Sequence, residues 1–422
     1  MIGKSELVQT SAKGTCILHI GVEKTGTTSI QKFIYQNEVR LKKGGLCLLH
    51  GFQKNNNLEF VQYFKLSLDD WAASKGIQNQ KQKRKYFLTF KGKFLAELER
   101  APTSNFLITS EHFSSRLTNP AELRELKGFL DQYFSEVKVL GWFRPQWEMI
   151  PSSWSTGIKA GMTASLEEYL ESASPSDPYF DHYQTAELWS EVFGLENCHF
   201  RIYEGFKSVD NDVRLDLLEA LRVLNFAYDF REFDFSSVRE NTSLSLFDAE
   251  LRRLVNSSVP RWQIKNRRRL PGKANAAIST RLEGLVPPVP IVISEDQARK
   301  IEQRFKKSNE LLYQKYFSGR SFSSVIPGAQ DILLPAAKIR EMIINIASTL
   351  LDVSPPKSTA ALVDADADVL RDAALRALEG GHLSESQALA LLKIAQRARP
   401  TGPLIRSTIE ALELKISANL GK

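Results

Sequence analysis

The stretch CILHIGVEKTGTT, residues 16–28, decides the fold of this 422-residue chain. Residues 16–20 form a mainly apolar run that predicts a buried strand. The following stretch, Ser29 to Leu41, has apolar residues at the spacing of one helix face. Glycine and hydroxyl residues between the two predict a tight loop at a helix N-terminus, where backbone N–H groups and the helix dipole favour an anion. Lys24 adds a full positive charge to that loop.

The position of the lysine distinguishes this loop from that of nucleotide hydrolases. Their pattern is G-x-x-x-x-G-K-[ST], with the lysine after the second glycine, whereas Lys24 precedes Gly26. The order K-T-G-T-T resembles the 5′-phosphosulfate loop of sulfotransferases that use 3′-phosphoadenylyl sulfate (PAPS). The resemblance implies that Lys24 contacts the sulfonate and the bridging oxygen. It also implies that the amides and hydroxyls of Thr25, Gly26, Thr27 and Thr28 hold the 5′-phosphate.

A second segment, VKVLGWF at residues 137–143, predicts another buried strand. Arg144 follows this strand directly, and Ser152 lies eight residues later. In the sulfotransferase superfamily a strand-end arginine and a serine at this spacing hold the 3′-phosphate. The chemistry agrees, because the guanidinium fork matches a phosphate and a serine hydroxyl adds a hydrogen bond. The plainer alternative for Arg144 is a charge held by a surface acid.

A base is the third requirement, since sulfuryl transfer to a hydroxyl needs a group that takes the proton. Glu111 and His112 follow the short predicted strand at residues 105–109. Several carbohydrate sulfotransferases use a glutamate or a histidine in this role, so both residues are candidates. The alternative for Ser110-Glu111 is a helix cap with an acid in the first turn.

The nucleotide-closing loop is less clearly marked. A strand ending in Tyr203-Glu204, after a helix that stops at Phe193-Gly194, resembles bacterial members of the superfamily. Cytosolic sulfotransferases close the site with a glycine-rich R-K-G loop, and this sequence contains none. The stretch RENTSLS at residues 239–245 is similar to one in the bacterial relatives. Arg239 and Asn241 are therefore expected as nucleotide-binding residues.

The order of elements predicts the fold class. Strands and helices alternate, which predicts a mainly parallel sheet with helices on both faces, a P-loop-like three-layer α/β domain over residues 1–328. Amphipathic patterns within it predict helices over Phe60–Trp71 and Lys85–Glu99. Residues 329–422 are rich in alanine and leucine and predict an all-α C-terminal module. Its helices are expected over Pro335–Leu351 and Asp366–Glu379, then up to Arg397 and from Pro403. This module has no reactive cluster, so we expect it to serve association, for example in a homo-oligomer.

Composition limits the classes of protein. The chain has 42% hydrophobic and 25% charged residues, as ordinary soluble proteins do. No apolar run approaches the roughly 20 residues that span a bilayer, and the first residues lack the apolar core of a secretory signal. Three cysteines without paired spacing indicate a reducing compartment and no metal site. We therefore expect a cytoplasmic location and no transmembrane segment.

The net charge of the chain is +7. Basic residues cluster at residues 81–85 and again at residues 261–273. The clusters are either solvated loops or a rim that attracts an anionic nucleotide or an acidic glycan. Nucleic acid is not expected as a partner, because no recognised binding motif accompanies the charge.

Together the motifs predict a PAPS-dependent sulfotransferase that needs no metal and moves a sulfonate to a hydroxyl of a carbohydrate or glycolipid by in-line displacement. A non-carbohydrate alcohol is an open alternative for the acceptor. Two further alternatives are a kinase with an unusual phosphate loop and a non-catalytic nucleotide-binding protein. A kinase would need an acid for Mg²⁺ and a lysine after the glycine, and the sequence offers neither arrangement.

Overall fold

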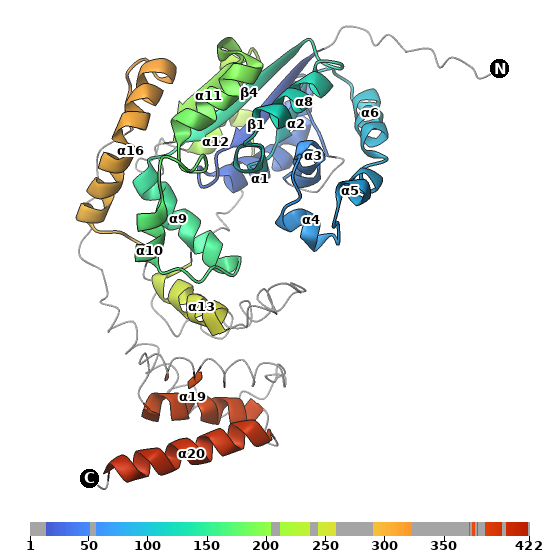
Figure 1. Ribbon diagram of the computed structural model, residues 1–422. Helices are drawn as coiled ribbons and strands as arrows, with labels where there is room; N and C mark the ends of the chain where they lie inside the picture. Colours follow the sequence, from blue (N-terminus) through green and yellow to red (C-terminus); the bar gives the residue numbers. More distant parts are fainter. Residues whose placement is uncertain are drawn as a thin grey trace, which may run out of the picture. The chain divides into compact units, whose positions relative to one another are not determined.

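The computed structural model describes residues 14–50, 56–203, 212–236, 244–258, 290–322, 385–398 and 402–420, with four single residues between 371 and 378 (Figure 1). The chain divides into two compact units. One comprises residues 1–153, 170–242 and 296–326, and the other comprises residues 154–169, 243–295 and 327–422. The predicted boundary between residues 328 and 329 lies outside the described residues, as do Arg239 and Asn241.

The first unit is built on a five-stranded sheet whose strands are all paired in parallel. The strand order is β2-β3-β1-β4-β5, which confirms the predicted α/β class. The strands are β1 (Thr15–Gly21), β2 (Cys47–Leu48), β3 (Phe106–Thr109), β4 (Glu136–Phe143) and β5 (Cys198–Ile202). Because parallel strands end at one edge of the sheet, the residues after β1, β3, β4 and β5 gather there.

Helices α1 (Thr27–Gln36) and α12 (Val213–Val223) cover one face of the sheet. Their apolar positions recur at helical spacing and form one buried cluster with sheet residues such as Ile17 and Trp142. The short helix α2 (Glu38–Lys43) extends this face. Burial of this stripe fixes the rotation of α1, and therefore fixes which of its residues face the end of β3.

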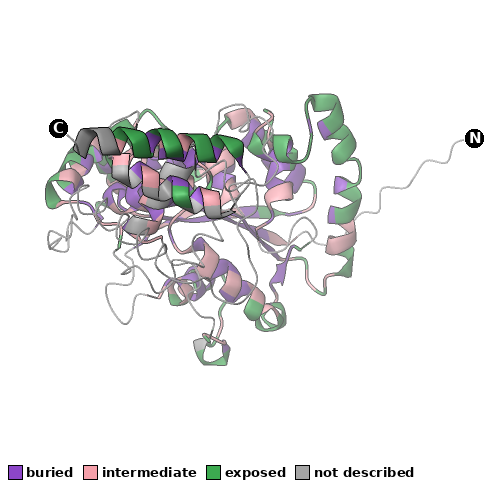
Figure 2. Ribbon diagram, turned by 90° about the horizontal axis from the view of Figure 1, so that it is seen from below, coloured by how far each residue is buried: buried purple, intermediate pink, exposed green. Residues whose placement is uncertain are grey.

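The other face carries α8 (Pro120–Leu130) and α11 (His182–Phe193), which contact each other, and α11 also contacts β4. Helix α16 (Glu295–Tyr316) ends beside the sheet. Its last residue, Tyr316, packs on Phe200, and the next residue, Phe317, packs on Phe143. The central strands are drawn mainly as buried in Figure 2. Helices therefore cover both faces, as the predicted three layers require.

The chain between β2 and β3, and directly after β3, forms five further helices within the described residues. They are α3 (Leu58–Phe64), α4 (Asp70–Ser74), α5 (Gln80–Tyr86), α6 (Phe90–Arg100) and α7 (His112–Arg116). The predicted helix over Phe60–Trp71 is wrong in extent, because the chain leaves the helix at Lys65 and Asp69 caps a new one by accepting from the amides of Trp71 and Ala72. The predicted helix over Lys85–Glu99 is likewise divided between α5 and α6.

Two further helices contain residues of both units. Helix α9 (Gln146–Lys159) begins in the first unit and ends in the second, and α10 (Leu166–Ser172) begins in the second and ends in the first. In the second unit, α13 (Leu246–Ser258) packs Leu246 and Ala249 against Trp154 and Ile158. Among the described residues no helix is long and apolar enough to cross a bilayer.

The last two predicted C-terminal helices are confirmed as α19 (Glu385–Ala398) and α20 (Pro403–Leu420). The one predicted over residues 335–351 lies outside the described residues, as does most of the one over 366–379. Buried residues of α19 and α20, among them Leu392 and Ile409, form one apolar cluster. Ion pairs Lys393–Glu413, at 2.7 Å, and Lys415–Glu385, at 2.8 Å, flank it. Along α20 buried residues recur every three or four positions, at Ile405, Ile409 and Leu412, and most of the other described residues are exposed (Figure 2), as in an amphipathic helix.

Two buried histidines predict that the protein loses stability in acid. Burial lowers the pKa of His19 to about 3 and that of His182 to about 4, whereas an unfolded histidine has a pKa of about 6.5. The unfolded chain therefore binds protons that the folded chain does not as the pH falls below about 6.5. Each histidine then contributes a loss of up to about 1.4 kcal/mol per pH unit.

Urea unfolding at several pH values tests this expectation. The free energy of unfolding should fall less steeply with decreasing pH in His19→Gln than in the wild type. An identical slope in the two proteins would show that His19 is not neutral and buried as described.

Candidate active site

The end of β1 and the loop that leads into α1 hold three residues in the left-handed backbone region. Their φ angles are +87° at Gly21, +70° at Lys24 and +78° at Gly26. A Cβ at Gly26 would also lie 3.1 Å from Cγ1 of Val213 and 3.3 Å from Cε2 of Tyr203, so a glycine is needed there. A left-handed conformation costs a lysine about 1–2 kcal/mol, and such strain is typical of functional sites.

The side chains of the loop have different structural roles. The hydroxyl of Thr25 is completely buried and donates to the carbonyl of Val22 at 2.6 Å. In this structure the hydroxyl of Thr25 thus closes the loop. Thr27 and Thr28 begin α1. The carboxylate of Glu23 accepts from the hydroxyl of Tyr179 at 2.9 Å, which ties the loop to the segment before α11.

Arg144 connects the loop to the end of β4. Its Nη1 donates to the carbonyl of Lys24 at 2.9 Å, across 120 positions of sequence. Its Nε donates to Oε2 of Glu148 at 2.8 Å, so the plainer interpretation, an arginine held by an acid, is also present. The structure thus places Arg144 directly beside Lys24.

Ser152 lies on α9, one turn beyond Glu148, so these two residues share one side of the helix. Glu148 in turn pairs with Arg144, which precedes the helix. Ser152 is partly exposed. Nε2 of His182 lies 2.7 Å from the carbonyl oxygen of Arg144, and this contact fixes the turn from β4 into α9. The eight-residue spacing of Arg144 and Ser152 is thus a strand end followed by two helical turns.

Glu111 is brought to the same edge by the end of β3. The amide of Ser110 donates to the carbonyl of His19 at 3.0 Å, and a Cβ at Gly21 would lie only 2.9 Å from Cα of Glu111. Oε2 of Glu111 accepts from Nε2 of Gln31 on α1 at 2.6 Å. The structure therefore brings Glu111 against the strand that leads into the loop.

His112 begins α7 beside Glu111, with its Nε2 3.7 Å from Oε1 of Glu111. Burial lowers the pKa of His112, although the Glu111 carboxylate opposes the shift. Nδ1 of His112 is buried and has no partner among the described residues. Burial therefore favours the uncharged form of this imidazole.

Gln31, Tyr179 and Tyr203 were not predicted from the sequence. The ring of Tyr203 lies against Gly26, and the guanidinium carbon of Arg144 lies 5.6 Å from its centroid. The sequence marks Tyr203 only as part of the Tyr-Glu pair at the end of a strand. This position points to the site only when β5 is known to neighbour β4. Gln31 and Tyr179 gave no signal, because a helical glutamine and a loop tyrosine are common on any surface.

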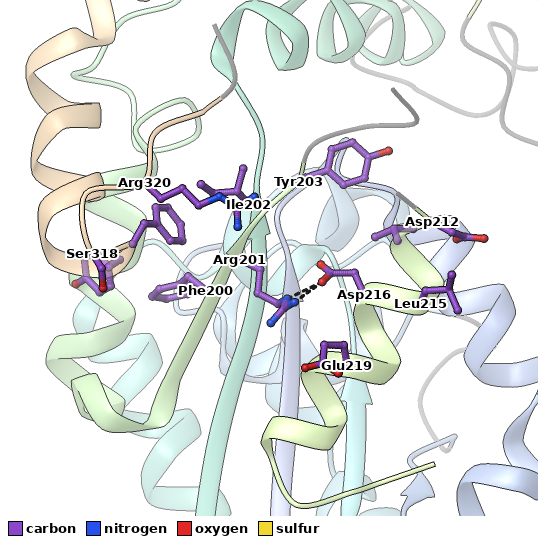
Figure 3. Close-up of a pocket in the computed structure, with 13 residues that line it drawn as sticks. Phe200, Arg201, Ile202, Tyr203, Asp212, Leu215, Asp216, Glu219, Ser318 and Arg320 are labelled. Carbon is purple, nitrogen blue, oxygen red and sulfur yellow. Dashed lines mark hydrogen bonds and ion pairs between the residues drawn. The ribbon is translucent and has the colours of Figure 1, made fainter. Parts of the chain in front are cut away.

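A pocket of about 570 Å³ lies at the outer edge of β5 (Figure 3). Its charged side chains include Arg201 and Asp216, which are joined by an ion pair in which Nε of Arg201 lies 3.0 Å from Oδ1 of Asp216. Tyr203 lines both this pocket and the loop at Gly26. The pocket therefore adjoins the group formed by Lys24, Gly26 and Arg144.

Comparison with known proteins finds no family model that matches the chain. A curated protein of Archaeoglobus fulgidus, described as uncharacterized, is 24% identical over 220 residues, which is 51% of this chain and 54% of that protein. The chain thus spans about half the length of the curated relative that it matches.

Two solved structures are similar in part. A sulfotransferase from Alicyclobacillus acidocaldarius has a TM-score of 0.33 and 13% identity, over 64% of this chain and 94% of its own. A sulfotransferase domain from the curacin biosynthetic pathway has a TM-score of 0.28 and 12% identity, over 70% of this chain and 98% of its own. Scores this low carry no argument about the chain, so the fold assignment rests on the strand order and pairing of its own sheet.

Proposed function

We propose that the protein is a PAPS-dependent sulfotransferase. The observation that carries the proposal is the hydrogen bond from Arg144 to the carbonyl of Lys24, at 2.9 Å. It joins two anion-binding motifs that lie far apart in the sequence, and each motif suits one phosphate of a 3′,5′-bisphosphorylated nucleoside. A ligand with a single phosphate group would use the loop alone.

The arrangement of the strands supports the direction of the nucleotide. The loop follows β1, Arg144 follows β4, and Tyr203 follows β5, which are successive strands in the sheet. In the proposed complex, the loop residues Thr25, Gly26, Thr27 and Thr28 hold the 5′-phosphate, and Arg144 with Ser152 holds the 3′-phosphate. Tyr203 forms an aromatic floor between them. Arg239 and Asn241 remain proposed as closing residues.

The chemistry follows from the positions of charge. Glu111 takes the proton of the acceptor hydroxyl, whose oxygen then forms a bond to sulfur. The bond between sulfur and the bridging phosphate oxygen breaks on the opposite side. Lys24 and the loop amides stabilise the negative charge that develops on the departing phosphate. No metal is needed in this scheme, because Lys24 supplies the positive charge.

For the acceptor we propose a carbohydrate or glycolipid, with a non-carbohydrate alcohol as the alternative. Radiolabelled PAPS incubated with octyl glucoside and lactose, and separately with phenol and octanol, distinguishes the two classes. Label on the sugars supports the proposal, and label only on phenol or octanol assigns the protein to small alcohols. If none of the four acceptors is labelled and PAPS is not consumed, the result would favour a non-catalytic nucleotide-binding protein.

Glu111→Gln tests the base. The glutamine side chain has the shape of glutamate and keeps an oxygen that accepts from Gln31, but it is not a base. Turnover should therefore fall about 10²- to 10⁴-fold. Binding of adenosine 3′,5′-bisphosphate, measured by calorimetry, should not change, because Glu111 does not hold the nucleotide. An unchanged rate in Glu111→Gln together with a large loss in His112→Asn would transfer the role to the histidine.

A further inference from the structure

Gln31 lies on α1 and is almost completely buried, with 5% of its surface exposed. Its amide nitrogen donates to Oε2 of Glu111 at 2.6 Å, the only orientation that an ionised carboxylate accepts. Gln31 lies four residues after Thr27 and three after Thr28, so it shares a helix face with them. The helix that begins at the anion-binding loop therefore also holds the carboxylate of Glu111.

The two oxygens of Glu111 have different surroundings. Oε2 accepts from Gln31, whereas Oε1 lies 3.7 Å from Nε2 of His112, which is beyond hydrogen-bond distance. The backbone of Glu111 is fixed by its close approach to Gly21. The contact with Gln31 fixes the side-chain torsions, and a carboxylate without that contact is able to turn toward the imidazole.

We propose that Gln31 is a positioning residue for sulfuryl transfer: by holding Oε2 of Glu111, it presents Oε1 to the acceptor hydroxyl. The inference rests on the proposed function, with Glu111 as the base. The acceptor proton moves to Oε1 as the acceptor oxygen bonds to sulfur, and the bisphosphate leaves with the electron pair of the broken S–O bond. Oε2 is then the carbonyl oxygen of a neutral acid and still accepts from Gln31, so the contact persists through the step.

Gln31→Met tests the role, because methionine has a similar length and no amide. We expect kcat to fall about 10- to 100-fold, the range for a misplaced catalytic group, with the KM for PAPS unchanged. The matched control is Gln36→Met on the same helix. It also removes a glutamine that bonds to a carboxylate, that of Asp234, but on the exposed side of α1, and it should keep the wild-type kcat.

A double variant separates positioning from a general structural effect. If Gln31 acts through Glu111, Gln31→Met should cause no further loss of kcat in a Glu111→Gln background. A loss of the same size in both backgrounds would overturn the proposal, as would wild-type kcat in the single variant. Octyl glucoside serves as the acceptor probe in these assays.

A measurement without nucleotide completes the test. The charges of Glu111, Arg116, Glu23 and Asp70 act on the imidazole of His112. NMR follows its titration, with His112→Asn assigning the signal. In Gln31→Met the released carboxylate should close on the imidazole and raise the pKa of His112, whereas Gln36→Met should not change it. An unchanged titration in Gln31→Met would contradict the positioning role even if the wild type transferred no sulfuryl group. Failure of the proposed function, a wild type without turnover of PAPS, is thus distinguishable from failure of the inference.

Discussion

Lys24→Ala should abolish sulfuryl transfer and leave the fold intact. The ammonium group is the charge that meets the developing negative charge on the leaving phosphate, and loss of such a group costs at least about 10³-fold in rate. Turnover of radiolabelled PAPS measures the loss, and thermal unfolding measures the stability. Near-wild-type turnover in the purified variant would show that Lys24 has no part in the chemistry.

The left-handed backbone at Lys24 supplies a sharper control. Lys24→Gly relieves the strain of a side chain at φ +70°, so it should be more stable than Lys24→Ala by about 1 kcal/mol, yet equally inactive. Lys43→Ala, on the exposed end of α2, should keep full activity. If Lys24→Gly recovered activity, the backbone rather than the ammonium group would be responsible.

Arg144→Ala should weaken the binding of adenosine 3′,5′-bisphosphate by about 2–4 kcal/mol, the cost of unpairing a charged contact. It should barely affect adenosine 5′-phosphosulfate, which lacks the 3′-phosphate. Calorimetry with both nucleotides gives the comparison. Equal losses would indicate that Arg144 supports the loop through the Lys24 carbonyl and does not bind the phosphate.

Glu148 offers a matched variant for that experiment. The Nε of Arg144 is held by Glu148 at 2.8 Å, so a 3′-phosphate at Arg144 would approach a carboxylate. Glu148→Gln removes this repulsion and should leave binding of the bisphosphate equal or tighter. A loss as large as that of Arg144→Ala would mean that the Arg144–Glu148 pair holds the strand end in place.

The sequence predicted the loop, β1, β4 and the parallel sheet because these features are local. An apolar run followed by glycines and a lysine has few alternative structures, and the alternation of elements then implies the topology. Lys24 and Arg144 came to the same edge for the same reason, since parallel strands end together.

The breaks in the helices were not predictable from hydrophobic spacing alone. The pattern from Phe60 to Trp71 continues across the chain turn at Lys65, and only the capping contacts of Asp69 with the amides of Trp71 and Ala72 start the new helix. Periodicity reports which side of a segment is buried, and two short helices at a bend satisfy it as well as one long helix does.

The contacts that complete the site depend on tertiary structure. Gln31 meets Glu111 across 80 residues, and Tyr203 meets Gly26 only because β5 neighbours β4 and α12 packs beside α1. The contact of the Thr25 hydroxyl with Val22 was not predictable for a related reason, because it depends on the left-handed turns at Lys24 and Gly26.

Calorimetric titration of the full chain with adenosine 3′,5′-bisphosphate, beside ADP and ATP, tests the central claim most directly. If the loop and Arg144 form one site for a nucleotide phosphorylated at both ends, the bisphosphate should bind at least about 10-fold more tightly than ADP or ATP, which corresponds to about 1.4 kcal/mol. Equal or tighter binding of ATP, in the presence of Mg²⁺, would contradict the account.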